Sequence, residues 1–232
     1  MQIYNYHFKT GEYIGPENAV ESPLEPGKYL IPAHATDQVP PVPGENQVAA
    51  FVADAWVLRA DYRANLYYDK LTKEEHTINE IGVEPDPGWT DQAPGPKTKW
   101  DEETSQWIPD LQAYQASKID EINAAFEAAT REPVTVEING TVYSMDGRED
   151  SARRMNEGLQ LSELAGETVI AIVDYNNAVH MGVSLADGRE IVKQQSLAYR
   201  ANYYIRANLR HQALQAESID DLAVIAWPGE SA

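Results

Sequence analysis

The positions of the prolines constrain the fold of this chain more than any other feature. Twelve of the 14 prolines lie at or before Pro109, and only two follow. Because proline fixes φ and lacks a backbone N–H, the first half cannot be rich in helix or in central strands. The six prolines within residues 23–43 predict an extended surface segment. We therefore expect a small, loop-rich, mainly β domain over residues 1–110 and a second domain over residues 111–232.

Short aromatic strands separated by turn residues predict that the first domain consists of small β-hairpins. Residues 100–107 read as an aromatic strand, a turn rich in Asp and Thr, and a second aromatic strand. The same pattern recurs at residues 68–72 and, more loosely, at residues 6–13. Side-chain oxygens of Asp and Thr can bond nearby backbone N–H groups, and aromatic residues pack well on a half-buried pleated surface. Repetition of one such unit favours a module for binding or assembly over a catalytic scaffold.

The second domain is predicted to be α+β, in the order helix, hairpin, helix, hairpin and long helix. Apolar residues at helical spacing predict a first helix that ends before Pro133. Asn139-Gly140 lies between two runs that alternate apolar and polar residues, which predicts a two-residue hairpin turn because both turn positions need positive φ. In that register Val136 faces Tyr143.

Three further elements complete the predicted second domain. Asp146 is expected to cap the second helix. The β-branched residues 168–173 and the residues 178–183 predict the second hairpin. The segment from Ser184 to Asp187 resembles a capping box with Asp in place of Glu or Gln, and it predicts a long helix that ends near residue 215.

The composition excludes several classes of function. The formal net charge is −19, from 37 acidic and 18 basic residues, and nucleic acid is not an expected partner because phosphate backbones need clustered Lys and Arg. The chain has no cysteine, which excludes disulfides, thiolate metal sites and cysteine nucleophiles. No apolar stretch is long enough for a membrane helix, and no signal peptide is visible. Because no metal-ligand spacing, phosphate loop or nucleophile elbow occurs, we expect no metal, no cofactor and no enzymatic activity.

The aromatic residues of the first domain are candidates for a binding surface. Aromatic rings beside Asp, Arg or Asn suit sugars, because sugar C–H groups stack on the ring while polar neighbours bond the hydroxyls. The alternative is that the rings form the core of a domain that has few other large apolar residues. We assign Trp56 to the core. The residues that stay open as contacts for a partner protein or a glycan are Asp61, Arg63, Tyr67, Tyr68, Trp89, Trp100 and Trp107.

The long helix expected near the end of the chain is basic, in contrast to the rest of the sequence. Five basic residues between Arg189 and Arg210 are opposed only by Glu190, and three tyrosines are interleaved with them. One interpretation is an ordinary solvated face whose tyrosines pack on the hairpins. The other is a docking face for an acidic partner or a neighbouring copy. The docking candidates are Arg200, Tyr203, Tyr204 and Arg206.

Two sets of segments carry a resemblance to known families. In the first domain they are residues 44–56, Asp61-Tyr62-Arg63, Leu66-Tyr67-Tyr68, Trp100-Asp101 and residues 107–110, with residues 10–13 and Pro40-Pro41 in addition. This pattern resembles the tail fibre assembly proteins of tailed bacteriophages, although Ala64 stands where those proteins usually have glycine. In the second domain the segments are residues 134–144, 174–179, Ser184-Leu185 and residues 219–228. They look like a domain of unknown function found at the C-terminal end of many phage tail proteins.

The resemblance implies a protein that acts on, or beside, a trimeric tail fibre, in the host cytoplasm during assembly or on the virion tail. Some proteins of this family are chaperones that bind the distal end of the fibre and assist its folding or trimerisation. The first hypothesis is therefore a tail fibre assembly chaperone or a fibre-associated tail component that contributes to host attachment. The alternatives are a structural baseplate or tail-tip subunit of the virion and a carbohydrate-binding receptor module for a host surface glycan.

Overall fold

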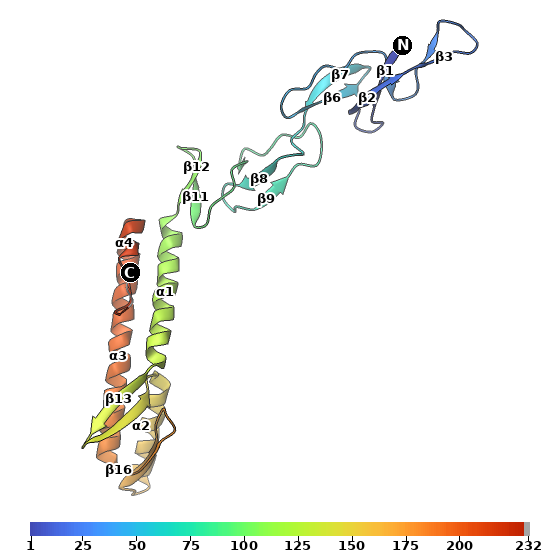
Figure 1. Ribbon diagram of the computed structural model, residues 1–232. Helices are drawn as coiled ribbons and strands as arrows, with labels where there is room; N and C mark the ends of the chain where they lie inside the picture. Colours follow the sequence, from blue (N-terminus) through green and yellow to red (C-terminus); the bar gives the residue numbers. More distant parts are fainter. Residues whose placement is uncertain (230–232) are drawn as a thin grey trace. The chain divides into compact units, whose positions relative to one another are not determined.

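The computed structural model describes residues 1–229. It contains both helices and antiparallel strands, which confirms the predicted α+β class. The chain divides into two compact units, one over Met1–Pro109 and one from Asp110 onward. Within residues 1–229, every helix belongs to the second unit, whereas the first unit is built from strands and turns (Figure 1).

The first unit consists of short antiparallel pairings and has no single continuous sheet. Its strands are β1 (Gln2–Tyr6), β2 (Tyr13–Asn18), β3 (Val20–Glu21), β4 (Tyr29–Leu30), β5 (Ala35–Thr36), β6 (Gln47–Val52), β7 (Ala55–Ala60), β8 (Leu66–Asp69), β9 (Glu75–Thr77), β10 (Trp89–Thr90), β11 (Thr98–Asp101) and β12 (Gln106–Pro109). β1 lies between β2 and β5, and β8 lies between β9 and β10. Each of these two sheets therefore has a central strand flanked by its hairpin partner and by a later strand. The pairs β3–β4, β6–β7 and β11–β12 are separate two-stranded hairpins.

A turn with similar hydrogen bonds recurs three times in the first unit, as the pattern of Asp and Thr predicts. The Asp69 carboxylate accepts from the backbone N–H groups two and three residues later, at 2.8 and 2.7 Å. The Asp101 carboxylate accepts from the N–H and the hydroxyl of Thr104, at 3.0 and 2.6 Å. These bonds hold the pKa of both carboxyls below the ordinary value. In the earliest turn His7 takes the place of Asp, and its ring nitrogen accepts from the N–H of Thr10 at 3.3 Å. The residue after the threonine has positive φ in all three turns, and these residues are Gly11, Lys73 and Ser105.

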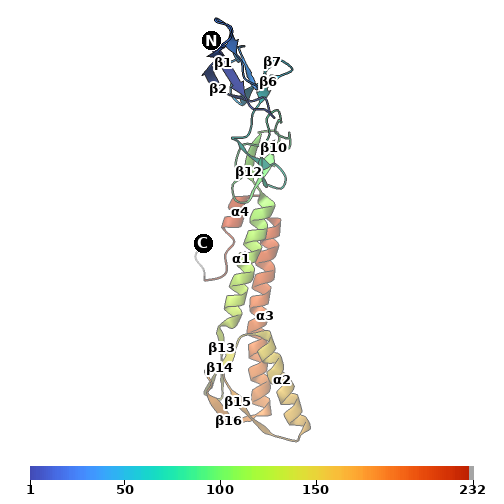
Figure 2. The ribbon, with the colours of Figure 1, turned by 90° about the vertical axis from the view of Figure 1, so that its right-hand side faces the viewer.

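The second unit has the predicted order of helix, hairpin, helix, hairpin and long helix. Its elements are α1 (Leu111–Arg131), β13 (Pro133–Ile138), β14 (Thr141–Asp146), α2 (Glu149–Leu164), β15 (Val169–Val173), β16 (Val179–Ser184), α3 (Leu185–Gln215) and α4 (Ile219–Ala223). Figures 1 and 2 show α1 and α3 side by side, with α2 and both hairpins at the end where α3 begins. The long helix α3 thus contacts α1, α2, β13, β15 and β16.

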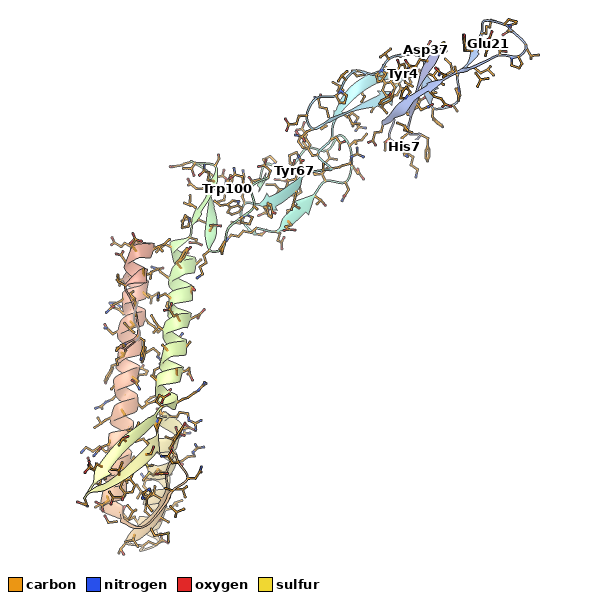
Figure 3. All side chains as sticks on the ribbon, viewed as in Figure 1. Tyr4, His7, Glu21, Asp37, Tyr67 and Trp100 are labelled. Atoms are coloured by element: carbon orange, nitrogen blue, oxygen red, sulfur yellow. The ribbon has the colours of Figure 1, made fainter. Side chains whose placement is uncertain are left out.

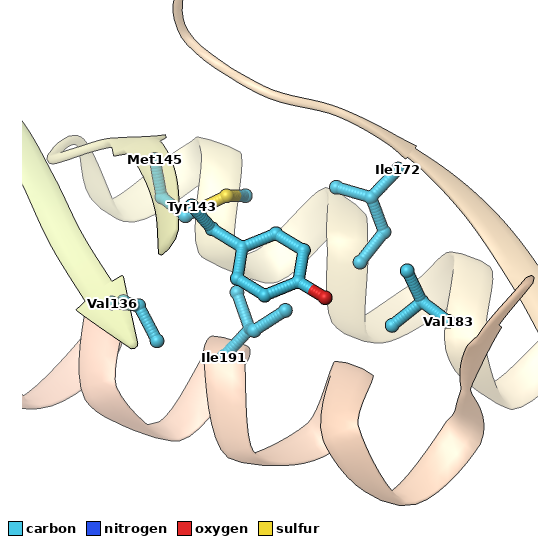
Figure 4. Close-up of a cluster of buried hydrophobic side chains, with 6 residues drawn as sticks. All are labelled: Val136, Tyr143, Met145, Ile172, Val183 and Ile191. Carbon is cyan, nitrogen blue, oxygen red and sulfur yellow. The ribbon is translucent and has the colours of Figure 1, made fainter. Parts of the chain in front are cut away.

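One core joins both hairpins to the start of α3 (Figure 4). Val136 and Ile191 are fully buried at its centre, at 0% exposure each. Val136 pairs with Tyr143 across the Asn139-Gly140 turn, which confirms the predicted register. The second hairpin contributes one face only, because side chains alternate between the two faces of a strand. The buried residues of the cluster are Val136, Tyr143, Met145, Ile172, Val183 and Ile191.

A second core holds the other half of α3 against α1 and α4. Ile122 of α1 packs with Leu209 and Ala213 of α3, so the two long helices run antiparallel. Leu222 of α4 belongs to the same cluster, and so does Ile225, which follows α4 in the chain. The short helix α4 therefore packs on the α1–α3 pair.

The predicted N-terminal capping residue is confirmed for α3 and is wrong for α2. Ser184 caps α3, and its hydroxyl accepts from the N–H of Asp187 at 3.0 Å. The prediction that Asp146 caps α2 is wrong, because Asp146 is the last residue of β14 and the helix begins at Glu149. The Asp146 carboxylate instead accepts hydrogen bonds from the backbone N–H and the guanidinium Nε of Arg148, at 3.0 and 2.9 Å. Arg148 thereby holds the pKa of Asp146 below its ordinary value, although partial burial opposes this.

Ala64 forms a turn that needs no glycine. The N–H of Asn65 donates to the carbonyl of Tyr62 at 3.1 Å, and Ala64 is not among the residues with positive φ. The backbone conformation is therefore open to any L-residue at this position. Alanine at this position therefore does not disturb the local turn.

Candidate functional site

A repeated set of contacts fixes one tryptophan in each half of the first unit. The sequence Thr-Asp-Gln-x-Pro precedes β6 and occurs again before β11. The indole Nε1 of Trp56 donates to the carbonyl of Gln38 at 2.9 Å, and that of Trp107 donates to the carbonyl of Gln92 at 2.8 Å. Each glutamine side chain donates in return to the backbone carbonyl two residues before the tryptophan, at 3.1 and 3.2 Å. We call this reciprocal pair of hydrogen bonds the indole clasp.

The indole clasp shows that the first unit is a tandem repeat, which the sequence analysis missed. Both acceptors of the clasp are backbone carbonyls, and no residue type in the sequence marks a carbonyl. The detectable signal is the five-residue pattern that begins at Thr36 and again at Thr90. Both threonines are buried, and each hydroxyl accepts from the N–H of the glutamine two residues later, at 3.2 Å in both cases.

The candidates Tyr67, Tyr68 and Trp89 occupy different environments. Tyr67, labelled in Figure 3, is only 6% exposed and belongs to the core of the second repeat. The Trp89 ring stacks on the ring of His76, with 4.3 Å between centroids and 5° between planes, so one of its faces is covered. Tyr68 is half-buried and lines a shallow polar hollow together with Asn46.

Trp100 and Trp107 lie directly opposite each other in the β11–β12 hairpin. Their rings meet edge to face with 5.4 Å between centroids, and both side chains are half-buried. The ammonium group of Lys70 lies 5.2 Å from the centre of the Trp100 ring, which is within the range of a cation–π contact. Trp100 therefore packs on Trp107 and on Lys70 of the β8–β9 turn.

Asp61 and Arg63 form an ion-pair cluster that includes a third residue, Glu12. The Arg63 guanidinium donates to both oxygens of Asp61 at 2.7 Å each. It also forms an ion pair with Glu12, a residue close to β2. The hydrogen bond from Arg63 lowers the pKa of Asp61, and the two carboxylates raise the pKa of Arg63. This cluster links the two repeats of the first unit through side chains that are partly exposed.

Three of the four candidates on α3 line a groove of the second unit. This groove, about 700 Å³ in volume, lies between α2 and α3. Arg200, Tyr203 and Tyr204 of α3 line it, and Arg153 of α2 lies opposite them. We call it the α2–α3 groove, and its complete lining is Glu149, Ala152, Arg153, Asn156, Val192, Ser196, Tyr199, Arg200, Tyr203 and Tyr204.

The charge of the α2–α3 groove differs from that of the chain as a whole. Within residues 1–229, neither Arg153 nor Arg200 forms an ion pair, and both side chains are exposed. Glu149 is the one carboxylate of the lining, and it interacts with Tyr199. Burial and this neighbouring carboxylate raise the pKa of the Tyr199 hydroxyl, so the hydroxyl stays protonated. The lining of the groove therefore includes two guanidinium groups that form no ion pair among the described residues.

Arg206 does not line the groove. Its guanidinium carbon lies 4.1 Å from the centre of the Phe126 ring and 5.1 Å from that of the Tyr203 ring. This arginine packs between α1 and α3, where it positions the Tyr203 side chain at the edge of the groove. The four docking candidates therefore divide into three groove residues and one packing residue.

The remaining features of the described chain concern metals and membranes. No group of three or more His, Asp or Glu side chains is placed to hold a metal ion in residues 1–229. In the same part of the chain, no helix has the length and the apolar character that crossing a membrane requires.

Comparison with protein-family models, with curated proteins and with solved structures finds no significant match.

Proposed function

We propose that the protein is a bacteriophage tail fibre assembly chaperone, or a fibre-associated tail component, that binds a tail fibre protein and has no enzymatic activity. The resemblance of the first unit to tail fibre assembly proteins supports the proposal. Trp56 and Trp107 belong to that resemblance, and both are held by indole clasps. Asp61 and Arg63 also belong to it, and they form the ion-pair cluster with Glu12. The family-like residues are thus the ones on which the architecture of the first unit depends.

The exposure of apolar side chains on the β3–β4 hairpin carries the proposal. Val20 and Leu30 face each other in this hairpin and are 72% and 53% exposed. Leu24, in the connecting loop, is 89% exposed. Single exposed apolar residues are normal, but a group on one hairpin indicates an interaction site.

The same hairpin offers free backbone groups for pairing. Among the described residues, β3 and β4 form a sheet only with each other, so each has an open outer edge. An open strand edge beside apolar side chains suits the addition of a strand from another protein. A fibre subunit that has not yet assembled exposes apolar surface and strand edges of this kind. A chaperone that covers such surface would keep the subunit soluble until it trimerises.

Co-expression with a bacteriophage tail fibre protein tests the proposal. We expect the protein to increase the yield of soluble fibre trimer and to co-purify with the fibre. The double variant Val20→Asp/Leu30→Asp should lose this effect, because two carboxylates would lie on the apolar surface of the hairpin. Leu71→Asp is the matched control, since Leu71 is 89% exposed in a different turn. If the wild-type protein leaves the yield unchanged and nothing co-purifies, the proposal fails.

Two further measurements distinguish the alternative roles. Mass spectrometry of purified phage particles separates a structural baseplate or tail-tip subunit, which would be present in stoichiometric amounts, from a chaperone that acts only in the host cytoplasm. A glycan array tests the receptor-module alternative, with Trp107→Ala as the control variant. Absence of glycan binding by the wild-type protein would remove that alternative.

A further inference from the structure

The α2–α3 groove combines the features of a peptide-binding site. It is concave, its volume of about 700 Å³ is in the range of ligand sites, and its walls belong to two helices and not to loops. Tyrosine and arginine are the residues that most often dominate binding energy at protein interfaces. The groove has three tyrosines and two arginines along its length.

Contacts within the second unit hold the tyrosine rings of the groove in place. The rings of Tyr203 and Tyr204 meet edge to face with 6.0 Å between centroids, and Arg206 packs against Tyr203 from the side of α1. Tyr204 is nevertheless 61% exposed, which leaves most of its ring open to a partner. A rigid aromatic side chain that is exposed before binding loses little conformational entropy when a partner covers it.

The charges indicate the chemistry of the occupant. Arg153 and Arg200 come from opposite walls and have no carboxylate partner among the described residues, in a chain whose net charge is −19. Three other basic residues of the two helices are paired, which are Arg154 with Asp150, Arg189 with Glu163 and Lys193 with Glu190. A planar guanidinium can bind a carboxylate through two parallel hydrogen bonds. The unpaired arginines therefore fit an acidic ligand.

We propose that the α2–α3 groove binds a short acidic segment of a partner protein, with an aromatic or apolar side chain of that segment packed against the exposed ring of Tyr204. Carboxylates of the segment pair with Arg153 and Arg200. A second copy of this chain is a poorer occupant, because two chains of charge −19 repel each other. The proposal does not depend on the tail fibre, since it concerns the groove and a peptide alone.

Fluorescence anisotropy of the purified full-length protein tests the proposal. The probe is a fluorescein-labelled peptide of sequence Gly-Asp-Glu-Phe-Asp-Glu-Trp-Asp-Gly, and the comparison peptide has lysine at every acidic position. We expect only the acidic peptide to bind, and its affinity should fall as the salt concentration is raised. The double variant Arg153→Ala/Arg200→Ala should bind at least about tenfold more weakly, because it removes two charge-assisted contacts. Tyr204→Ala should weaken binding as well.

Arg210→Ala is the matched control, because Arg210 is exposed on the same helix and does not line the groove. Its affinity should stay within about twofold of wild type, since exposed charges away from a site contribute little. Equal binding of the two peptides, or an unchanged affinity in the double variant, would overturn the proposal. Light scattering supplies the other decisive result: a wild-type dimer that the double variant converts to monomer would show that a second copy occupies the groove.

Discussion

The replacement Ile191→Ala tests whether the start of α3 supports both hairpins of the second unit. Ile191 is fully buried, and its cluster includes Val136 from the first hairpin and Ile172 from the second. Truncation to alanine leaves the helix intact, because alanine has the highest helix propensity. The substitution therefore changes packing and not the local backbone.

The expected cost follows from the volume that the substitution removes. Loss of the buried methyl and methylene groups of an isoleucine costs roughly 2.4 kcal/mol, at about 0.8 kcal/mol for each carbon group. The neighbours cannot fill the space fully, because the buried ones come from four different strands, and the residual cavity adds about 1 kcal/mol. We expect the free energy of unfolding to fall by about 3–4 kcal/mol, and Ile191→Val to cost about 1 kcal/mol.

A urea titration followed by circular dichroism at 222 nm measures this cost, because the helices of residues 1–229 all belong to the second unit. Leu214→Ala is the control, since Leu214 lies on the same helix and is exposed. It should change the free energy of unfolding by less than about 0.5 kcal/mol. A cost below about 1 kcal/mol for Ile191→Ala would refute the reasoning, because it would mean that the residue is not part of a close-packed core.

Three further predictions concern the clasp, a turn and acid stability. Trp107→Phe should lower the free energy of unfolding of the first unit by about 0.5–1.5 kcal/mol in a thermal melt followed by near-ultraviolet circular dichroism, because it removes the hydrogen bond from the indole N–H to the Gln92 carbonyl. Gly11→Ala should lower the melting temperature of the same unit, because Gly11 has a φ of 73° and a Cβ there would overlap a backbone oxygen of β6. Burial opposes ionisation of Asp174, but backbone hydrogen bonds and His180 outweigh it and hold its pKa below the ordinary 3.8. The pKa of Asp174 is thus lower in the folded than in the unfolded state, so its contribution to stability is present above about pH 4 and is lost as the pH falls further. In urea titrations between pH 6 and 3, Asp174→Asn should therefore flatten the dependence of the free energy of unfolding on pH.

The sequence predicts best where local chemistry decides the structure. Asn139-Gly140 can adopt the positive φ values that a two-residue hairpin requires, so the register of β13 with β14 was predictable. The cap at Asp146 was not, because β14 continues through this residue and its carboxylate binds Arg148. An aspartate before a helix has several possible partners, and only the tertiary structure selects one.

Features that depend on tertiary packing could not be predicted from the sequence. The face of the hairpin on which Trp100 and Trp107 lie depends on the register of β11 with β12. No turn residue in the sequence specifies this register. The α2–α3 groove requires that α2 packs along α3, so Arg153 could not be associated with Arg200 in advance. The tyrosines and arginines of the long helix were nevertheless identifiable, because the local excess of basic residues stands out in an acidic chain.

The central claim is that this protein binds a tail fibre protein, and the molar mass of the purified mixture tests it most directly. Size-exclusion chromatography with light scattering would be applied to the protein, to the tail fibre protein used for co-expression, and to both together. The proposal predicts a new species whose mass equals a fibre oligomer plus one or more copies of the 25.9 kDa chain, and Val20→Asp/Leu30→Asp should abolish it. Two unchanged peaks at micromolar concentrations of both proteins would contradict the claim.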